Sequence, residues 1–125
     1  MPITVTWYGH ACIGLEVGEH RLLVDPFLTG NPLAAAAPDQ LDPTVVLVSH
    51  GHGDHVGDAL DIARRTGALV ISNFEITNWF QAQGHANVHP QHIGDRGQYV
   101  ERLRVPVIDD RSVLSRKLDE ERDEQ

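Results

Sequence analysis

The sequence predicts an α/β fold in which antiparallel strands lead into a parallel part of the sheet. Two observations support this prediction. The first 25 residues contain short segments of alternating apolar and polar residues joined by tight turns, as in an antiparallel meander. From residue 44 to residue 84, strand-like and helix-like segments then follow one another, and this order is typical of parallel strands.

Three strands are expected at the N-terminus. Residues 3–8 alternate, with Ile3, Val5 and Trp7 on one face, and Gly9-His10 interrupts the pattern. Residues 12–17 form the second candidate strand, and Gly18-Glu19 is a turn into the third, residues 20–25. Residues 27–43 contain three prolines and read as a long loop, with one helical turn expected across residues 34–37.

The α/β part begins with residues 44–48, a continuous β-branched run typical of a strand buried on both faces. Residues 58–65 are expected to form a helix that ends at Gly67, where a C-cap glycine belongs. Residues 68–72 predict another strand, and Asn73 can cap a second helix that ends near Gly84.

The remaining residues lose this pattern. We therefore expect a folded unit over residues 1–94 and a divergent, charged tail over residues 95–125. Pro106 lowers the strand potential there, and residues 109–125 hold seven acidic and four basic side chains. Such a segment is expected to be partly disordered or a frayed helix.

Composition excludes several classes of protein. The net charge of −8 argues against a nucleic-acid binder, which would carry a basic face. The single cysteine, Cys12, rules out a disulfide within the chain and reads as a buried thiol. Since we find neither a signal peptide nor an apolar run long enough to cross a bilayer, we expect a cytoplasmic protein without membrane contact.

Three of the eight histidines fall within six residues, in the run His50-Gly51-His52-Gly53-Asp54-His55. Residues two apart on an extended chain point the same way, and glycines let the backbone curl between them. Imidazole and carboxylate groups suit zinc, with manganese and iron as alternatives. Core packing cannot explain four ionisable side chains in one loop, so a divalent metal site is favoured over unliganded surface histidines.

The run Ser49-His50-Gly51-His52-Gly53-Asp54-His55 resembles the hallmark motif of the metallo-β-lactamase superfamily. Four flanking segments resemble the UPF0173 metal-dependent hydrolases of that superfamily: residues 8–12, 22–32, 57–59 and 73–75. The resemblance covers roughly residues 1–94. It implies the N-terminal half of an αββα sandwich, a mixed sheet with helices on one face and metals at one edge.

The same resemblance implies roles for individual residues. His50 and His52 would ligate a first metal, and Asp54 and His55 a second. Asp54 would also be the catalytic residue, orienting or deprotonating water, with a metal-bound hydroxide attacking an ester, lactone or phosphoester. His10 and Asp25 are candidates for contacts to these ligands, although Asp25 reads equally well as a turn residue before Pro26.

Members of the family supply further ligands from a second half that these 125 residues do not contain, so we expect an incomplete site and one sheet face without its partner. Three hypotheses follow: a metal-dependent hydrolase acting on a small molecule, a non-catalytic remnant that binds metal or a partner chain, and a half-domain that forms a homo-oligomer through the exposed face. His85, His89 and His92 are expected in solvated loops. Trp7 and Trp79 fit packing better than substrate stacking.

Overall fold

A computed structural model describes residues 2–91. Within them a six-stranded sheet has the order β1-β2-β3-β4-β5-β6. The strands are β1 (Ile3–Gly9), β2 (Cys12–Val17), β3 (His20–Val24), β4 (Val45–Leu47), β5 (Leu69–Ser72) and β6 (Val88–Pro90). The helices are the 3-10 helix η1 (Pro38–Gln40), α1 (Gly53–Val56), α2 (Ala59–Thr66) and α3 (Phe74–Ala82).

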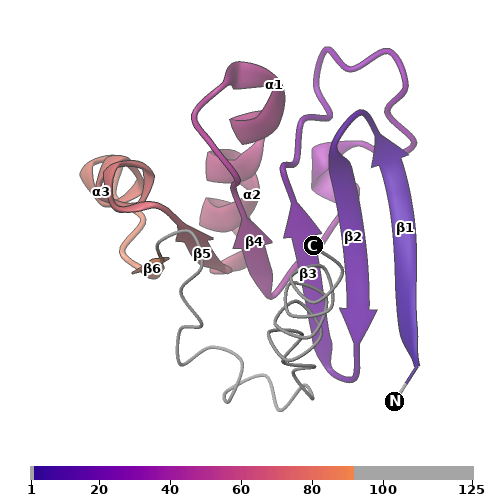
Figure 1. Cartoon of the computed structure of the whole chain (residues 1–125), viewed down its shortest axis with the longest axis horizontal. Helices are drawn as coiled ribbons and strands as arrows, with labels where there is room; N and C mark the ends of the chain where they lie inside the picture. Colours follow the sequence, from indigo (N-terminus) through magenta and orange to yellow (C-terminus); the bar gives the residue numbers. More distant parts are fainter. Residues whose placement is uncertain (1, 92–125) are drawn as a thin grey trace, which may run out of the picture.

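The sheet is mixed, as the sequence predicts (Figure 1). β1, β2 and β3 are antiparallel neighbours, and β3, β4, β5 and β6 are parallel ones. Because β3 and β4 run the same way, the segments that follow them leave the sheet at the same edge. The chain between them crosses from one end of the sheet to the other through residues 25–44.

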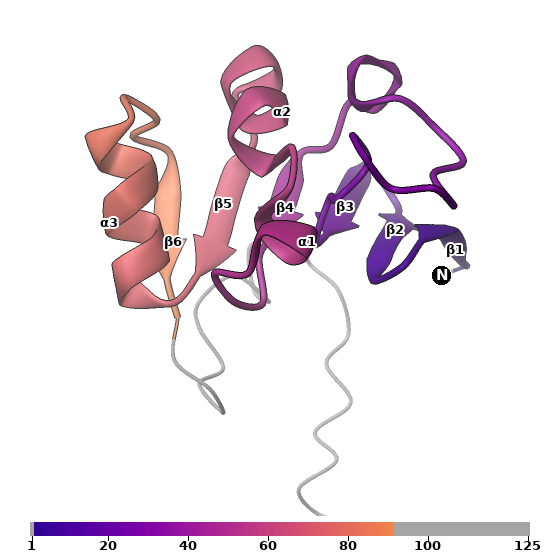
Figure 2. The ribbon, with the colours of Figure 1, turned by 90° about the horizontal axis from the view of Figure 1, so that it is seen from above.

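One face of the sheet carries the core and the helices. Ile62 on α2 and Phe80 on α3 are fully buried with Val46 and Val70 of the central strands. Figure 2 shows α2 standing over this face. Cys12 lies in the same cluster, as expected of a buried thiol, with 0% of its surface exposed.

The opposite face is almost wholly apolar. Strand register pairs residues that point to the same side of a sheet, and two apolar rows across β1 to β5 result. The rows are Val5-Leu15-Leu22-Val45-Leu69 and Trp7-Ile13-Val24-Leu47-Ile71. At the β1 edge Ile3, Val5 and Trp7 are 54%, 65% and 60% exposed. No helix among residues 2–91 covers this face.

Local signals for the helix ends are confirmed. The Asn73 side chain accepts a hydrogen bond from the Ile76 amide at 2.9 Å, and Gly67 caps α2 in the left-handed conformation with φ 70°. The prediction of a helical turn across residues 34–37 is wrong, because the turn begins at Pro38, as η1. There Pro38 fixes φ, and the Gln40 side chain accepts a hydrogen bond from the Ala37 amide. No described helix has the length and apolar character needed to cross a bilayer. The predicted tail, residues 95–125, lies outside the described residues.

Candidate metal centre

The histidine cluster lies at the edge where two parallel strands end. Asp25 directly follows β3, and Ser49 comes two residues after the end of β4. The Asp25 amide donates to the Leu47 carbonyl at 2.9 Å, which ties the two strand ends together. The loop after Ser49 then turns back through the short helix α1, which carries Asp54 and His55. The carboxyl ends of parallel strands are the usual place for a ligand site in an α/β sheet.

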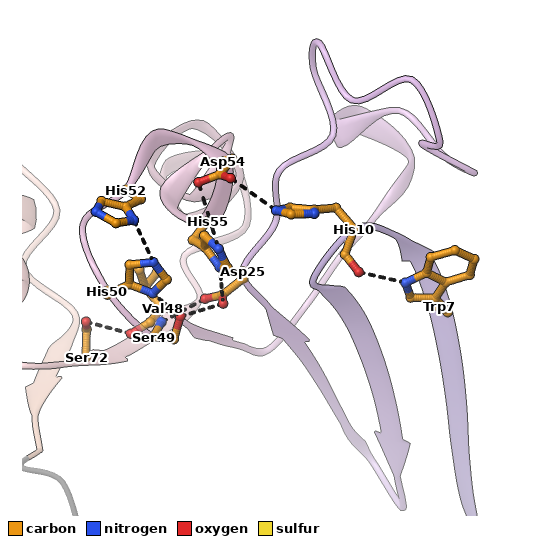
Figure 3. A network of polar contacts seen from close by, with 10 residues as sticks. All are labelled: Trp7, His10, Asp25, Val48, Ser49, His50, His52, Asp54, His55 and Ser72. Carbon is orange, nitrogen blue, oxygen red and sulfur yellow. Dashed lines mark hydrogen bonds and ion pairs between the residues drawn. The ribbon is translucent and has the colours of Figure 1, made fainter.

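Asp25 is the buried centre of this arrangement (Figure 3). Only 4% of its surface is exposed, and its carboxylate accepts three hydrogen bonds. One oxygen accepts from the Ser49 amide at 2.7 Å, and the other accepts from the Ser49 hydroxyl at 2.6 Å and from Nδ1 of His55 at 2.8 Å. Its backbone is in the left-handed region, with φ 45°. The structure therefore combines both roles considered for Asp25, a turn residue and a partner of the histidines.

These contacts determine which nitrogen each histidine presents. Because the Asp25 carboxylate accepts from Nδ1 of His55, Nε2 is the nitrogen that keeps a lone pair when the ring is neutral. The Ser49 hydroxyl donates its hydrogen to Asp25, so it can only accept a hydrogen bond from Nδ1 of His50, at 2.8 Å. The neutral His50 ring therefore also carries its lone pair on Nε2, which forms a hydrogen bond with Nδ1 of His52. One buried carboxylate thus orients two imidazoles, one directly and one through Ser49.

The free nitrogens and the Asp54 carboxylate form two groups. Nε2 of His50 lies 3.1 Å from Nδ1 of His52. Nε2 of His55 lies 3.8 Å from one oxygen of Asp54. Two ligands of a tetrahedral zinc ion with bonds near 2.05 Å are separated by about 3.3 Å, so both spacings are close to what a shared cation requires.

The four predicted ligands are brought together rather than splayed apart. The ring centroids of His50 and His55 are 4.0 Å apart, and those of His50 and His52 are 4.6 Å apart. Two sets of three donors have all their ligand atoms within 4.8 Å of one another: His10-Asp54-His55 and Asp25-His50-His55. His52 belongs to neither set and approaches only His50 among the described contacts. In the second set we assign Asp25 to orientation, because its oxygens already accept three hydrogen bonds.

His10 is placed closer to the centre than the sequence indicates. Its Nε2 lies 3.2 Å from the second oxygen of Asp54, and its ring centroid is 5.3 Å from that of His55. A register shift between Trp7 and Gly9 and a positive φ of 53° at His10 turn the side chain toward α1. The indole of Trp7 donates to the His10 carbonyl at 2.8 Å and braces this turn.

Asp54 is exposed, and its neighbours stabilise the ionised form of its carboxyl group. Desolvation raises the pKa of the Asp54 carboxyl, but the hydrogen bond with His10 and the charge of His55 outweigh it, and the pKa lies below its usual value. The carboxylate is therefore ionised at neutral pH and available as a ligand or hydrogen-bond acceptor.

Two supporting residues were not assigned a role from the sequence. Ser49 stands in the motif, but only the fold shows that its hydroxyl joins Asp25 to His50. Asp58 precedes α2, and one of its oxygens accepts from the amides of Leu28 and Thr29 at 3.0 and 2.8 Å, holding the loop that follows Asp25.

The histidines beyond the motif are arranged differently from expectation. His85 is only 7% exposed, and its Nε2 meets the Ala68 carbonyl at 2.8 Å, so the prediction of a solvated loop residue is wrong for it. His89 lies on β6 and has a partner of its own. His92 lies outside the described residues.

Comparison with known proteins agrees with the site. Residues 4–110 match the family described as the beta-lactamase superfamily domain. A "UPF0173 metal-dependent hydrolase" of Methanopyrus kandleri is 51% identical over 90 residues, which are 72% of this chain and 39% of that protein. Another from Carboxydothermus hydrogenoformans is 47% identical over 102 residues, 79% of this chain and 45% of that protein.

A solved structure shares the fold. It is a metallo hydrolase from the hyperthermophilic archaeon Ignicoccus hospitalis, 30% identical, with a TM-score of 0.70 over 81% of this chain and 44% of that one. The chain thus spans about two fifths of the length of the curated relatives that it matches.

Proposed function

The chain belongs to the β-lactamase superfamily, and we propose from this premise that it carries the metal-binding half of a hydrolase site. The observation that supports the proposal is the convergence of free imidazole nitrogens and the Asp54 carboxylate at one sheet edge, prepared by the buried Asp25. Neutral imidazoles and carboxylates are the donors that zinc prefers, with manganese and iron also compatible. The names of the relatives, metal-dependent hydrolases, agree with this donor set.

The ligand roles we propose are those of the sequence motif. His50 and His52 would hold one cation, and Asp54 with His55 a second, with His10 close enough to Asp54 to join the second set. A bound divalent cation supplies Lewis acidity, polarising a scissile C=O or P=O bond and making water more acidic. Among the described residues each set offers at most three donors, so the remaining positions are open to substrate, to solvent or to the further ligands that the family resemblance implies.

The chain's own residues do the positioning. Asp25 and Ser49 hold His55 and His50 in the tautomers that present Nε2. The pKa of Asp54 is lowered, so its carboxylate is a weak base. It is therefore better suited to orient water as a hydrogen-bond acceptor than to deprotonate it. We therefore propose Asp54 as the catalytic residue that aligns water with a small ester, lactone or phosphoester. The choice of zinc and a cytoplasmic location stay predictions.

Metal binding and turnover test this proposal separately. Zinc should bind in calorimetry, and zinc-dependent cleavage of 4-nitrophenyl acetate or bis(4-nitrophenyl) phosphate should accompany it. His50→Ala should lose turnover and bind zinc more weakly, while His20→Ala, which removes an imidazole at the far end of β3, should change neither. Equal zinc affinity in the two variants would contradict the assignment of the site.

A second candidate function is supported by the apolar sheet face that no described helix covers. Its two apolar rows, with Ile3, Val5 and Trp7 more than half exposed, suit a partner chain or a second copy of this one. Under this alternative the chain binds metal without turnover until the face is covered. Mass measurement in solution, with metal analysis, separates the cases: a homo-oligomer that Val5→Lys converts to a monomer would support it, and a monomeric wild-type chain with two metals and turnover would exclude it.

A further inference from the structure

We propose that a hollow between α1 and α3 binds an aromatic ring of the substrate, one that carries no negative charge. This inference rests on the proposed function, because it names the part of the substrate that lies beside the metal centre. The hollow, called here the α1–α3 hollow, has a volume of about 410 Å³ and is lined by Gly51, Gly53, Val56, Gly57, Glu75, Ile76 and Trp79. Pockets that hold small molecules are of this size or larger, so it fits one ring-sized group.

The hollow adjoins the metal centre through the backbone. Gly51 and Gly53 stand on either side of His52, so the loop that carries the ligands also forms one wall. A Cβ atom built on either glycine would meet nothing within 4 Å. The space beside these glycines is therefore open. A group held there contacts the two sequence neighbours of His52, a proposed ligand.

The other wall is a braced aromatic surface. Trp79 on α3 is 43% exposed, so part of its ring is accessible to a ligand. Its ring meets the fully buried Phe80 edge to face, with centroids 5.2 Å apart and planes at 89°. An indole fixed in this way loses little entropy on binding, and it can stack against a planar partner. Val56 and Ile76 complete an apolar lining.

The charge of the hollow selects against anions. Glu75, in the first turn of α3, is the single ionisable side chain among the described lining residues, and none of these is basic. A carboxylate or phosphate on the bound group would face Glu75 without a counter-charge. A neutral ring, or one with a hydroxyl or ammonium donor, would avoid that repulsion.

Binding to the metal-free chain tests the hollow without hydrolysis. Trp79 emission would be followed during titration with 3-phenylpropylamine and with propylamine. We expect the phenyl compound to bind about tenfold tighter or more, because the ring removes apolar surface from water. Trp79→Phe should abolish the signal change, and Trp7→Phe, on β1, should retain it. Equal affinity for the two amines would overturn the proposal.

The charge preference has its own control. The anion 3-phenylpropanoate should bind about fivefold more weakly than 3-phenylpropylamine, as expected for a charge several ångströms from Glu75 near the surface. Glu75→Gln should remove that difference and leave zinc affinity unchanged. A preference for the anion in the wild-type chain would overturn the assignment of ligand class.

Selectivity links the hollow to turnover. With zinc present, kcat/KM for ethyl 3-phenylpropanoate should exceed that for ethyl butanoate, and Trp79→Ala should lower this ratio about tenfold. Phe74→Ala serves as the matched control, since Phe74 is 55% exposed on the same helix but does not line the hollow. Ring binding without any hydrolysis would refute the proposed function and leave the hollow standing. Hydrolysis whose ratio is insensitive to Trp79→Ala would refute the hollow and leave the function standing.

Discussion

Replacing Asp25 by asparagine should uncouple the histidines from the fold that prepares them. An amide has one acceptor and one donor group, whereas the Asp25 carboxylate accepts three hydrogen bonds on two oxygens. If the amide oxygen keeps the bond from the Ser49 amide, the NH2 group faces the Ser49 hydroxyl and Nδ1 of His55. Both of these must then accept, which forces the proton of His55 onto Nε2, the atom that should ligate metal.

The size of the effect follows from these contacts. Hydrogen bonds to a charged group contribute about 1.5–3 kcal/mol each, and two of the three are lost or reversed, so we expect about 3 kcal/mol less free energy of unfolding for the metal-free chain. Zinc affinity should fall about 10- to 100-fold, as for other changes to groups that orient ligands. Asparagine tolerates the φ of 45° at this position, so backbone strain does not obscure the result.

Three measurements check this prediction. Urea denaturation gives the stability, calorimetry gives the zinc affinity, and ¹⁵N chemical shifts of the imidazole rings report the tautomers of His50 and His55. Asp58→Asn is the matched control: it removes the same charge, but one amide oxygen can still accept from Leu28 and Thr29. Unchanged zinc affinity and unchanged tautomers in Asp25→Asn would refute the reasoning.

Three further predictions concern single residues. His52→Ala should abolish binding of the first cation, because Nδ1 of His52 is the nitrogen that lies 3.1 Å from Nε2 of His50; an unchanged zinc stoichiometry in calorimetry would contradict this. Gly57→Ala should lower the free energy of unfolding, measured in urea, by about 3 kcal/mol or more, because the added Cβ would lie 2.5 Å from Cα of Phe27 at a φ of 44°. The control Gly84→Ala, at a φ of 92° with nothing within 4 Å of the added Cβ, should lower it by about half as much. Burial, with the charges of Asp25 and Asp58, raises the pKa of Cys12 to about 12, so its reaction with a disulfide reagent at pH 8 should be about a thousandfold slower than in urea; equal rates would show that the thiol is accessible.

Much of the fold follows from local patterns in the sequence. Alternation predicts β1, β2 and β3, and the β-branched run predicts the buried β4 within a residue or two. Asn73 and Gly67 mark helix ends because their chemistry acts over one turn. β6 was not expected: Val88–Pro90 is three residues long and ends in proline, and it exists as a strand only because β5 offers an open edge to pair with.

The site was predictable where its residues are adjacent in sequence and less so where they are distant. The motif from His50 to His55 shows its spacing directly. By contrast, the contact of His10 with Asp54 spans 44 residues and depends on a register shift in β1, which no spacing rule reveals. The curled loop was expected, but its path through α1, a helix of four residues, was not. His85 was misjudged because its burial depends on the return of the chain after α3.

The histidine motif needs Asp25 to form the site, because the motif supplies the candidate ligands and Asp25 orients them. The histidines are exposed or half-buried and have little packing to hold them, so their orientation must come from a group that is itself fixed. Asp25 is that group, since the β3–β4 ladder positions its backbone and burial confines its side chain. The folding of this edge is then coupled to metal binding. A cation that binds only the oriented imidazoles stabilises the same folded edge by mass action. In the metal-free chain the edge is therefore held by the Asp25 carboxylate and the β3–β4 ladder, and this ladder should be the part of the sheet whose amide protection rises most when zinc is added.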